Sequence, residues 1–369
     1  MQSRILFILH LPPPVHGAAM VGKYIHDSKL INSSFDCYYI NLSLANDLED
    51  IGKKGFDRLK RIFSLLHKVR KTVREIRPDL VYITPNAKGG SFYYKEVWIV
   101  RMLKSMNCTI VAHYHNKGVA SRQNKFIDNI LYKHFFSNIK VILLAEVLYE
   151  DIKKYVKRED VYICPNGIPQ NSNNIYIDRS ILHEPIKLLF LSNLIISKGV
   201  LVLLDALEIL KDKGYSFVCS FVGGETQEIT SERFSLEVKK RNLTNYAFYK
   251  GRKFDKEKEN EFINSNIFVF PTYNECFPLV LLEAMEYHLP IVTTDEGGIS
   301  DIIKDKVNGL ICEQQDPDSL AECIEALIND ETLRIQLGEN GYRVFKENFT
   351  LDKFEERLFN IFNNLITDK

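Results

Sequence analysis

The chain has 369 residues, which is enough for two domains of ordinary size. Hydrophobic residues make up 45% of it and charged residues 26%, a balance that excludes a disordered or fibrous protein. Lys+Arg and Asp+Glu both number 48, so the overall charge gives no sign of a nucleic-acid partner. The charges are unevenly placed, because residues 1–184 hold 27 basic and 17 acidic side chains and the remainder holds 21 and 31. This asymmetry predicts two domains that face different partners.

The cysteines and the apolar runs indicate the compartment. The chain holds seven dispersed cysteines without a C-x-x-C pair, a pattern that favours free thiols in a reducing cytosol over disulfides or a zinc site. No stretch approaches the ~18–20 apolar residues that span a bilayer. The apolar run after Arg4 is short and ends at Pro12, so it resembles a first strand more than a signal peptide. We therefore expect a cytoplasmic protein, with the inner face of the cell membrane as a second possible place.

Short apolar runs alternate with segments of helical period along the first half of the chain. The predicted strands are Ile5–Leu9, Leu80–Thr84, Thr109–His115, Val141–Leu144 and Val161–Cys164. The predicted helices lie near 17–30, 57–76, 92–106, 122–136 and 146–157. Strands this apolar, separated by crossovers of helix length, predict a parallel sheet that is covered on both faces.

The second half repeats the scheme. Its predicted strands are Lys187–Leu191, Phe217–Val222, Tyr246–Tyr249, Ile267–Phe270, Ile291–Thr294 and Leu310–Cys312. The fold class is therefore α/β, with two doubly wound, Rossmann-like domains. A polar stretch at 170–184 is the expected boundary, which gives domains 1–184 and 185–350. The tail, 351–369, has apolar residues at helical spacing, and we expect an amphipathic helix that packs back towards the N-terminal domain.

Residues 53–77 are strongly basic. They carry ten Lys or Arg and two acidic residues, together with an apolar stripe at helical spacing. One interpretation is a core-packed helix with a solvated basic face. The other is docking on an anionic membrane surface, which basic residues favour. Binding of nucleic acid is less favoured, because no aromatic platform accompanies the charge.

The strongest chemical motif is Asn274–Met285, which follows the strand Ile267–Phe270. Glu275 should lie in the loop at the end of that strand, and Glu283 should lie two turns into the next helix. The N–H groups of Phe277–Leu279 then lie at the start of a helix, which favours an anion. Two carboxylates on either side of N–H donors suit a phosphorylated, hydroxyl-rich ligand.

This motif, the following segments His288–Asp295 and Gly297–Ile299, and the turn Asp305–Leu310 together resemble the retaining GT-B glycosyltransferases of the glycosyl transferases group 1 (GT4) family. The resemblance covers residues 187–345 and, more loosely, the rest of the chain. It implies the GT-B fold, in which two Rossmann-like domains face a cleft.

The resemblance also implies roles for residues of the second domain. Glu275 would lie by the donor sugar and Glu283 would bind the ribose of the nucleotide. The sugar hydroxyls and the diphosphate would meet backbone N–H groups of the segment after Glu275, which comprises Cys276, Phe277, Pro278 and Leu279. Pro278 itself has no N–H.

A second element of the resemblance is the strand and loop Phe190–Gly199, in which Ser197 is expected to cap a helix beside Lys198. Lys198 would hold the diphosphate, while Asn193 stands where family members often carry Arg. Arg252 or Lys253 is a candidate to compensate for that missing guanidinium. The glycine turn at Gly223 resembles the loop near the nucleotide base.

Three further places belong to the first domain. The small residues around Gly17, after a proline-rich turn, would let a helix start approach the diphosphate. His113 and His115 share one face of a strand, and the resemblance assigns His115 to the donor sugar. The turn Pro165–Ile168 is expected to supply a left-handed conformation and a wall of the cleft.

Together these features predict a retaining, metal-independent glycosyltransferase of the hexosyltransferase type. It would move a sugar from a nucleoside diphosphate sugar, UDP- or GDP-linked, to a hydroxyl of a surface polysaccharide or a lipid-linked glycan. Glu275, His115 and Lys198 would be its catalytic residues, with no cofactor. Two alternatives stay open: a non-catalytic nucleotide-sugar-binding or assembly subunit, or a GT-B sugar-nucleotide epimerase or phosphorylase.

Overall fold

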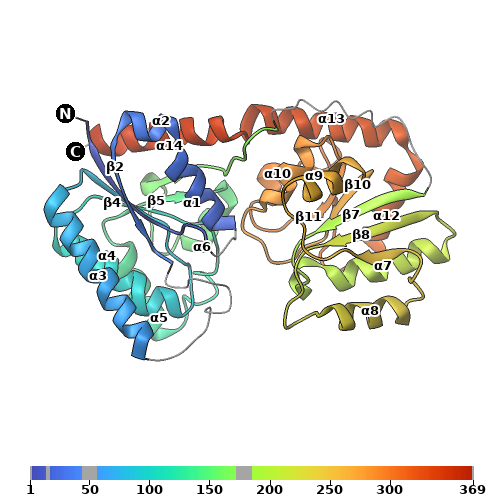
Figure 1. Cartoon of the computed structure of the whole chain (residues 1–369), viewed down its shortest axis with the longest axis horizontal. Coiled ribbons are helices and arrows are strands. Elements are labelled where there is room, and N and C mark those ends of the chain that lie inside the picture. Colours follow the sequence, from blue (N-terminus) through green and yellow to red (C-terminus); the bar gives the residue numbers. More distant parts are fainter. Residues whose placement is uncertain (1, 14–16, 44–55, 172–184, 368–369) are drawn as a thin grey trace. The chain divides into compact units, whose positions relative to one another are not determined.

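A computed structural model describes residues 2–13, 17–43, 56–171 and 185–367 (Figure 1). The chain divides into two compact units, each of which has its own core. The N-terminal unit comprises residues 1–166 together with 351–369, and the C-terminal unit comprises residues 167–350. The chain thus leaves the first unit after Asn166, whereas the sequence-based boundary lay at 184. Residues 172–184 lie outside the described residues.

The N-terminal unit is built on a six-stranded parallel sheet in the order β2-β1-β3-β4-β5-β6. Its strands are β1 (Arg4–Leu9), β2 (Asp36–Asn41), β3 (Leu80–Ile83), β4 (Ile110–His113), β5 (Lys140–Leu143) and β6 (Val161–Ile163). Strand β2 was not predicted. It is an edge strand, only half-buried and polar at both ends, so it lacks the continuous apolar run of its neighbours.

Helices cover this sheet: α1 (Gly17–Asp27), α2 (Lys29–Ser34), α3 (Phe56–Ile76), α4 (Val97–Ser105), α5 (Phe126–Phe136), α6 (Tyr149–Ile152) and α14 (Leu351–Thr367). A π-helical turn, Phe92–Glu96, precedes α4. Helix α4 lies between α3 and α5 and contacts both (Figure 1). Helix α5 begins at Phe126, four residues later than predicted, because the residues before it form turns that follow β4.

The last helix, α14, belongs to the N-terminal unit although it follows the whole C-terminal unit in sequence. It contacts α2 and β3 (Figure 1). Its Phe362 ring lies edge-on to Phe7 and Tyr82 at centroid distances of 5.7 and 5.6 Å. The amphipathic face of the helix therefore forms part of the core of this unit.

The C-terminal unit has a second six-stranded parallel sheet, in the order β12-β11-β10-β7-β8-β9. Its strands are β7 (Ile186–Leu191), β8 (Phe217–Val222), β9 (Ala247–Tyr249), β10 (Ile267–Phe270), β11 (Ile291–Thr294) and β12 (Leu310–Cys312). All six match predicted strands. Its helices are α7 (Val200–Asp212), α8 (Ser231–Lys240), α9 (Asp255–Ile263), α10 (Leu279–Glu286), α11 (Ile299–Ile302), α12 (Pro317–Asn329) and α13 (Glu331–Asn348).

The prediction of two doubly wound α/β domains is confirmed. In both units the central strands are almost wholly buried, as expected for parallel strands with helices on both faces. Among the described residues, none of the helices combines the length and the apolar character that crossing a bilayer requires.

Candidate donor site

The loops that carry the predicted site residues of the C-terminal unit leave the carboxyl ends of β7, β8, β9 and β10. In parallel sheets these ends share one edge, where ligands commonly bind. The loop after β7 contains Lys198 and ends at Gly199, which adopts a left-handed conformation with φ +83°. A Cβ atom on Gly199 would lie 2.1 Å from the Pro271 carbonyl oxygen, so only glycine allows this close approach to the loop after β10.

Hydrogen bonds join the same two loops. The Ser197 carbonyl accepts from the Tyr273 N–H at 2.9 Å and from the Thr272 hydroxyl at 3.1 Å. The expectation that Ser197 caps a helix is wrong, because it lies in a 3-10 turn and the N-cap of α7 is Gly199. Ser197 instead fixes one loop to the other through its backbone carbonyl. This docking sets the position of Lys198.

Lys198 and Glu275 form an ion pair at the meeting point of these loops. The Lys198 Nζ lies 2.5 Å from Glu275 Oε1 and donates a second hydrogen bond to the Asn274 carbonyl at 2.9 Å. Their side chains are 17% and 20% exposed, so the pair is shielded but reachable from solvent. The structure thus brings two of the three predicted catalytic residues together.

The next loop along the sheet fixes the backbone of Glu275. The Glu275 N–H donates to Glu296 Oε1 at 3.1 Å, and the Glu275 Oε2 accepts from the Cys276 N–H at 3.2 Å. Gly297, with φ +57°, lies where a Cβ would come within 2.4 Å of the Glu275 carbonyl oxygen. Glu296 was missed at the level of sequence, because a carboxylate in a loop gives no periodic signal.

Helix α10 begins directly after this loop. Pro278 is its N-cap, and none of the described side chains caps the helix. The Leu281 N–H donates to the Pro278 carbonyl at 3.2 Å, and the N–H groups before it are the ones that a ligand or water can satisfy. Glu283 lies in the second turn of α10, where Lys258 of α9 donates to it at 2.6 Å. Each predicted ligand carboxylate is therefore paired with a lysine, and Lys258 is the partner that sequence reasoning missed.

Asn193, Gly224 and Arg252 lie together at the ends of β7, β8 and β9. The Asn193 Oδ1 accepts from the Gly224 N–H at 3.0 Å. A Cβ on Gly224 would lie 2.2 Å from the Arg252 guanidinium, which means that Arg252 reaches across this glycine. Gly223, with φ +153°, would bring a Cβ within 1.9 Å of the Ser192 carbonyl oxygen. The guanidinium of Arg252 thus lies close to the place of Asn193.

The histidines of the N-terminal unit lie at the end of β4. Their rings are adjacent, with centroids 4.2 Å apart. His113 is fully buried and its Nδ1 lies 2.8 Å from the Tyr82 hydroxyl. Burial, followed by the neighbouring His115, holds the pKa of His113 well below its usual value, so His113 is neutral. His115 is only partly buried.

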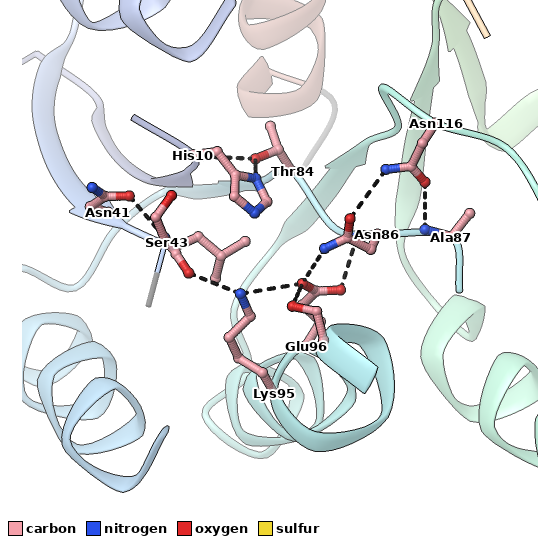
Figure 2. A network of polar contacts seen from close by, with 11 residues as sticks. His10, Asn41, Ser43, Thr84, Asn86, Ala87, Lys95, Glu96 and Asn116 are labelled. Atoms are coloured by element: carbon pink, nitrogen blue, oxygen red, sulfur yellow. Dashed lines mark hydrogen bonds and ion pairs between the residues drawn. The ribbon is translucent and has the colours of Figure 1, made fainter. Parts of the chain in front are cut away.

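A polar network holds the loops after β3 and β4, and Figure 2 shows it. Glu96, fully buried in the π-helical turn, accepts from the Asn86 N–H, the Asn86 side-chain amide and the Ser91 hydroxyl, each at 2.8 Å. The amide of Asn116, next to His115, accepts from the Ala87 N–H at 2.6 Å. Lys95, also buried, lies 3.5 Å from Glu96 and donates to the Leu42 carbonyl. The network fixes the backbone beside His115.

One expectation for the N-terminal unit needs correction, and one stays a prediction. No described atom lies within 4 Å of a Cβ built on Gly17, so the approach of the diphosphate to this helix start stays a prediction. Gly22 of the same helix packs on the chain itself, because a Cβ there would lie 2.0 Å from the His10 carbonyl oxygen. Neither Asn166 nor Gly167 has a positive φ, so the turn at Pro165–Ile168 is not left-handed. Within the part of the chain that the structure describes, no cluster of three or more His, Cys, Asp or Glu is placed to hold a metal ion.

The chain is similar to several known proteins. The chain is 26% identical over 329 residues to the O-antigen chain mannosyltransferase C of Escherichia coli, covering 86% of this chain and 84% of that protein. It is 30% identical over 180 residues to the capsular polysaccharide biosynthesis glycosyltransferase CapM of Staphylococcus aureus. That match covers 48% of this chain, which spans only 46% of CapM. The solved structure of Anabaena Alr3699/HepE in complex with UDP and glucose superimposes with a TM-score of 0.72 at 14% identity, covering 98% of this chain and 100% of that one.

The two doubly wound units define the GT-B class of protein, whose fold the Anabaena structure shares. Residues 174–344 match the family described as Glycosyl transferases group 1. This match lies within the C-terminal unit, residues 167–350.

Proposed function

We propose that the protein is a retaining glycosyltransferase that moves a sugar from a nucleoside diphosphate sugar to a hydroxyl acceptor of a surface polysaccharide or a lipid-linked glycan. The observation that carries the proposal is the Lys198–Glu275 pair, held beside the uncapped start of α10 by docked loops. A cation, N–H donors and a carboxylate at one sheet edge suit a ligand that joins a diphosphate to a sugar. The UDP complex of HepE and the polysaccharide relatives support this choice of substrates.

The proposed roles follow from charge. Breaking the bond between sugar and diphosphate leaves negative charge on the phosphate and positive character on the sugar. Lys198, the start of α10 and Arg252 are assigned to the diphosphate, where fixed positive groups stabilise the leaving charge. Lys198 must then exchange its contact with Glu275 for one with phosphate. Glu275 is thereby released to the sugar, near which its charge stabilises the developing cation.

Other residues are assigned to binding. Glu283 is given the ribose hydroxyls, in exchange for part of its contact with Lys258. The turn at Gly223 is assigned to the base, and His115 of the N-terminal unit is assigned to the sugar. Asn193 carries no charge and cannot replace an arginine on phosphate, so the guanidinium of Arg252, which lies beside Gly224, is assigned to that role. Attack of the acceptor on the same face of the sugar, assisted by the leaving phosphate, gives retention.

The first test is a panel of UDP- and GDP-sugars, scored by thermal stabilisation and then by transfer or hydrolysis. A ligand that binds the native state raises the apparent melting temperature. The expected result is stabilisation by one sugar nucleotide and its turnover, with the anomeric configuration of the product retained by NMR. Binding without any turnover would favour the non-catalytic alternative, and release of an epimerised sugar nucleotide would favour the epimerase.

The mechanism uses cationic side chains and helix dipoles on the diphosphate, and it predicts activity that survives exhaustive chelation with EDTA. The measurement is the initial rate of transfer before and after chelation, with a metal-dependent transferase treated in parallel as a control. An absolute requirement for Mn²⁺ or Mg²⁺, restored by adding the ion back, would contradict the proposed stabilisation of the leaving group.

A further inference from the structure

We propose that the first turns of α3, α4 and α5 form a docking surface for an anionic lipid bilayer. The docking surface comprises seven apolar side chains: Leu59, Phe63, Tyr94, Trp98, Phe126, Ile127 and Ile130. Residues 53–77 alone were expected to contact a membrane, and the docking surface adds α4 and α5 to them. Of that expected segment, 53–55 lie outside the described residues. Its use for a lipid-linked acceptor rests on the proposed function, whereas the docking itself does not.

The docking surface concentrates the exposed apolar side chains of the protein. Twelve large hydrophobic side chains are exposed among the described residues. Six of them lie on these three helices, and Tyr94 lies in the π-helical turn before α4. Phe126 is 79% exposed, Ile127 69% and Phe63 68%. Single exposed apolar residues are ordinary on a soluble protein, but several on adjacent helices mark a site of interaction.

The topology explains why these residues gather. Each of the three helices connects one parallel strand to the next, so it runs back against the strands and begins near the carboxyl edge of the sheet. The seven residues lie in the first two turns of their helices or in the π-helical turn before α4. Because α4 contacts both α3 and α5 (Figure 1), the three helix starts are neighbours. They form one surface beside the edge that carries His115.

These side chains do not belong to the core of the unit. Other residues of the same helices fill that role and are almost fully buried: Ile62, Val69, Val73, Ile99, Leu103, Tyr132 and Phe135. The predicted apolar stripe of α3 thus divides in two: Ile62, Val69 and Val73 are buried, whereas Leu59 and Phe63 are exposed to solvent. Folding alone does not account for the exposed group.

The charges around the docking surface fit an anionic partner. The exposed basic side chains near the starts of these helices are Lys60, Arg61, Arg101 and Lys125. Further along the same helices, Lys68, Arg70, Lys71, Arg74 and Lys133 are also exposed. Arg101 lies over the Trp98 ring at 5.7 Å, which joins a cation to an aromatic side chain within the surface. Trp and Tyr favour the headgroup level of a bilayer, and long basic side chains reach from there to anionic lipids.

A bilayer fits this composition better than a second copy of the chain does. The acidic second half of another copy would complement the charge equally well. Lysine, however, is depleted at protein–protein interfaces, whereas basic residues that flank aromatic ones are typical of interfacial membrane binding. The experiment must therefore distinguish binding to lipid from binding to the acidic surface of a second copy.

Trp98 is the only tryptophan in the chain, so its fluorescence reports on the docking surface directly. With the full chain and vesicles that contain phosphatidylglycerol, we expect its emission to shift to the blue and to be quenched by brominated acyl chains. Vesicles of phosphatidylcholine alone should give no shift, and high salt should reverse it, because salt screens the charges. Binding to anionic vesicles without a change at Trp98 would overturn the proposal.

The matched variants are Phe63→Ser with Phe126→Ser on the docking surface, and Leu236→Ser with Val307→Ser on the C-terminal unit. The control residues are 67% and 55% exposed. Sedimentation with anionic vesicles should weaken about tenfold or more for the first pair, since two aromatic contacts with the bilayer are lost, and should not change for the second. Equal binding of vesicles by both double variants would overturn the proposal. It would also be overturned if the parent protein and the variants bind no vesicles, and light scattering shows a dimer that only the Phe63→Ser, Phe126→Ser variant loses.

The failure of the docking and the failure of the proposed function give different results. The docking variant should keep the thermal stabilisation by the sugar nucleotide and the hydrolysis of the donor, because its changes lie on exposed side chains. A protein that turns over no sugar nucleotide but places Trp98 in anionic vesicles would overturn the transferase and retain the docking surface. Turnover of a sugar nucleotide by a protein that does not bind anionic vesicles would retain the transferase and overturn the docking surface.

Discussion

Glu275 lies in the loop before α10 and Glu283 lies in α10 itself, and each is paired with a different lysine. We expect substitutions of the two glutamates to affect different kinetic parameters. Glu275→Gln should lower kcat about 10²-fold while nucleotide binding persists, because its charge acts near the reacting sugar in the transition state. Glu283→Ala should raise KM for the donor, because the ribose lies far from the bond that breaks and its contacts act equally before and during reaction. Steady-state kinetics beside calorimetric titration of the free nucleoside diphosphate would check both.

The control for these two variants is Glu325→Gln. Glu325 forms a comparable pair with Lys213 at 2.6 Å, on α12 and away from the donor loops. The Glu325→Gln variant should keep kcat and the KM for the donor unchanged. If Glu275→Gln loses the nucleotide while Glu283→Ala retains it, the assigned roles are inverted.

Glu286, one turn after Glu283, gives a pH-dependent prediction. Burial, and then repulsion by Glu283 and Glu259, raises the pKa of Glu286 to about 7, while its Oε1 accepts from the Asn171 N–H at 2.5 Å. The folded state therefore holds this proton more tightly than the unfolded chain, whose pKa is near 4.5. Its contribution to stability is present below about pH 4.5 and is lost as the pH rises to about 7.

Glu286→Gln keeps an oxygen for the Asn171 N–H and removes the charge. The melting temperature of this variant should exceed that of the parent at pH 8, and the difference should shrink at pH 5. Thermal unfolding of both proteins across this range is the measurement. A difference that stays constant between pH 5 and pH 8 would mean that the Glu286 carboxyl does not titrate there.

At the scale of elements, the close contact between the loops after β7 and β10 rests on Gly199. In Gly199→Ala the new methyl group would meet the Pro271 backbone, so the loops must separate and carry Lys198 away from Glu275. Gly214→Ala is the matched control, because Gly214 has nearly the same φ, +85°, and no described atom lies within 4 Å of a Cβ built on it. The control should lose only about 1–2 kcal/mol from left-handed strain.

Gly199→Ala should lose more stability than the control and should also lose kcat, whereas Gly214→Ala should keep kcat. Chemical denaturation and transfer assays on the two variants would check this. Equal losses in both would mean that backbone strain alone matters and that the loop contact does not position Lys198.

The sequence predicted those elements best that are apolar and deeply buried. Strands such as β7 and β10 are continuous apolar runs and lie where they were expected, and the loops after them follow from strand polarity alone. Strand β2 escaped because its edge position leaves its residues half-exposed. Two contacts of the site join separate elements: Lys258 donates to Glu283, and the Glu275 N–H donates to Glu296. The spacing of residues along one segment does not predict such contacts.

The charged network around Glu96 escaped prediction for a related reason. Lys95 and Glu96 are consecutive charged residues near the start of a predicted helix, a pattern typical of a solvated surface. Both are buried, and groups from the loops after β2 and β3 satisfy them: the Leu42 carbonyl accepts from Lys95, and Asn86 and Ser91 donate to Glu96 (Figure 2). Only the tertiary structure supplies those partners.

At the scale of the whole molecule, the two units should respond separately to core substitutions. Phe362→Ala in α14 removes a ring packed on Phe7 and Tyr82, and it should destabilise the N-terminal unit by about 3–5 kcal/mol. Phe262→Ala is the reciprocal control, since Phe262 stacks on Tyr287 at 5.3 Å within the C-terminal unit.

Hydrogen exchange followed by mass spectrometry would resolve the two units. The first variant should lose protection in residues 4–166, although the change lies near residue 362, and the second should lose it in 186–350. Loss of protection spread evenly over both units in either variant would show that they unfold as one cooperative block.

The return of α14 to the N-terminal unit has a consequence for synthesis on the ribosome. Residues 167–350 are contiguous and can fold as soon as they emerge, whereas the N-terminal sheet lacks its last covering helix until Leu351–Thr367 appears. At ordinary rates of translation, making the intervening segment takes roughly 10–40 s. During that time Phe7 and Tyr82 lack the ring of Phe362, so the nascent first unit presents an incomplete apolar face to chaperones. The unit that is made first is therefore the one that is finished last.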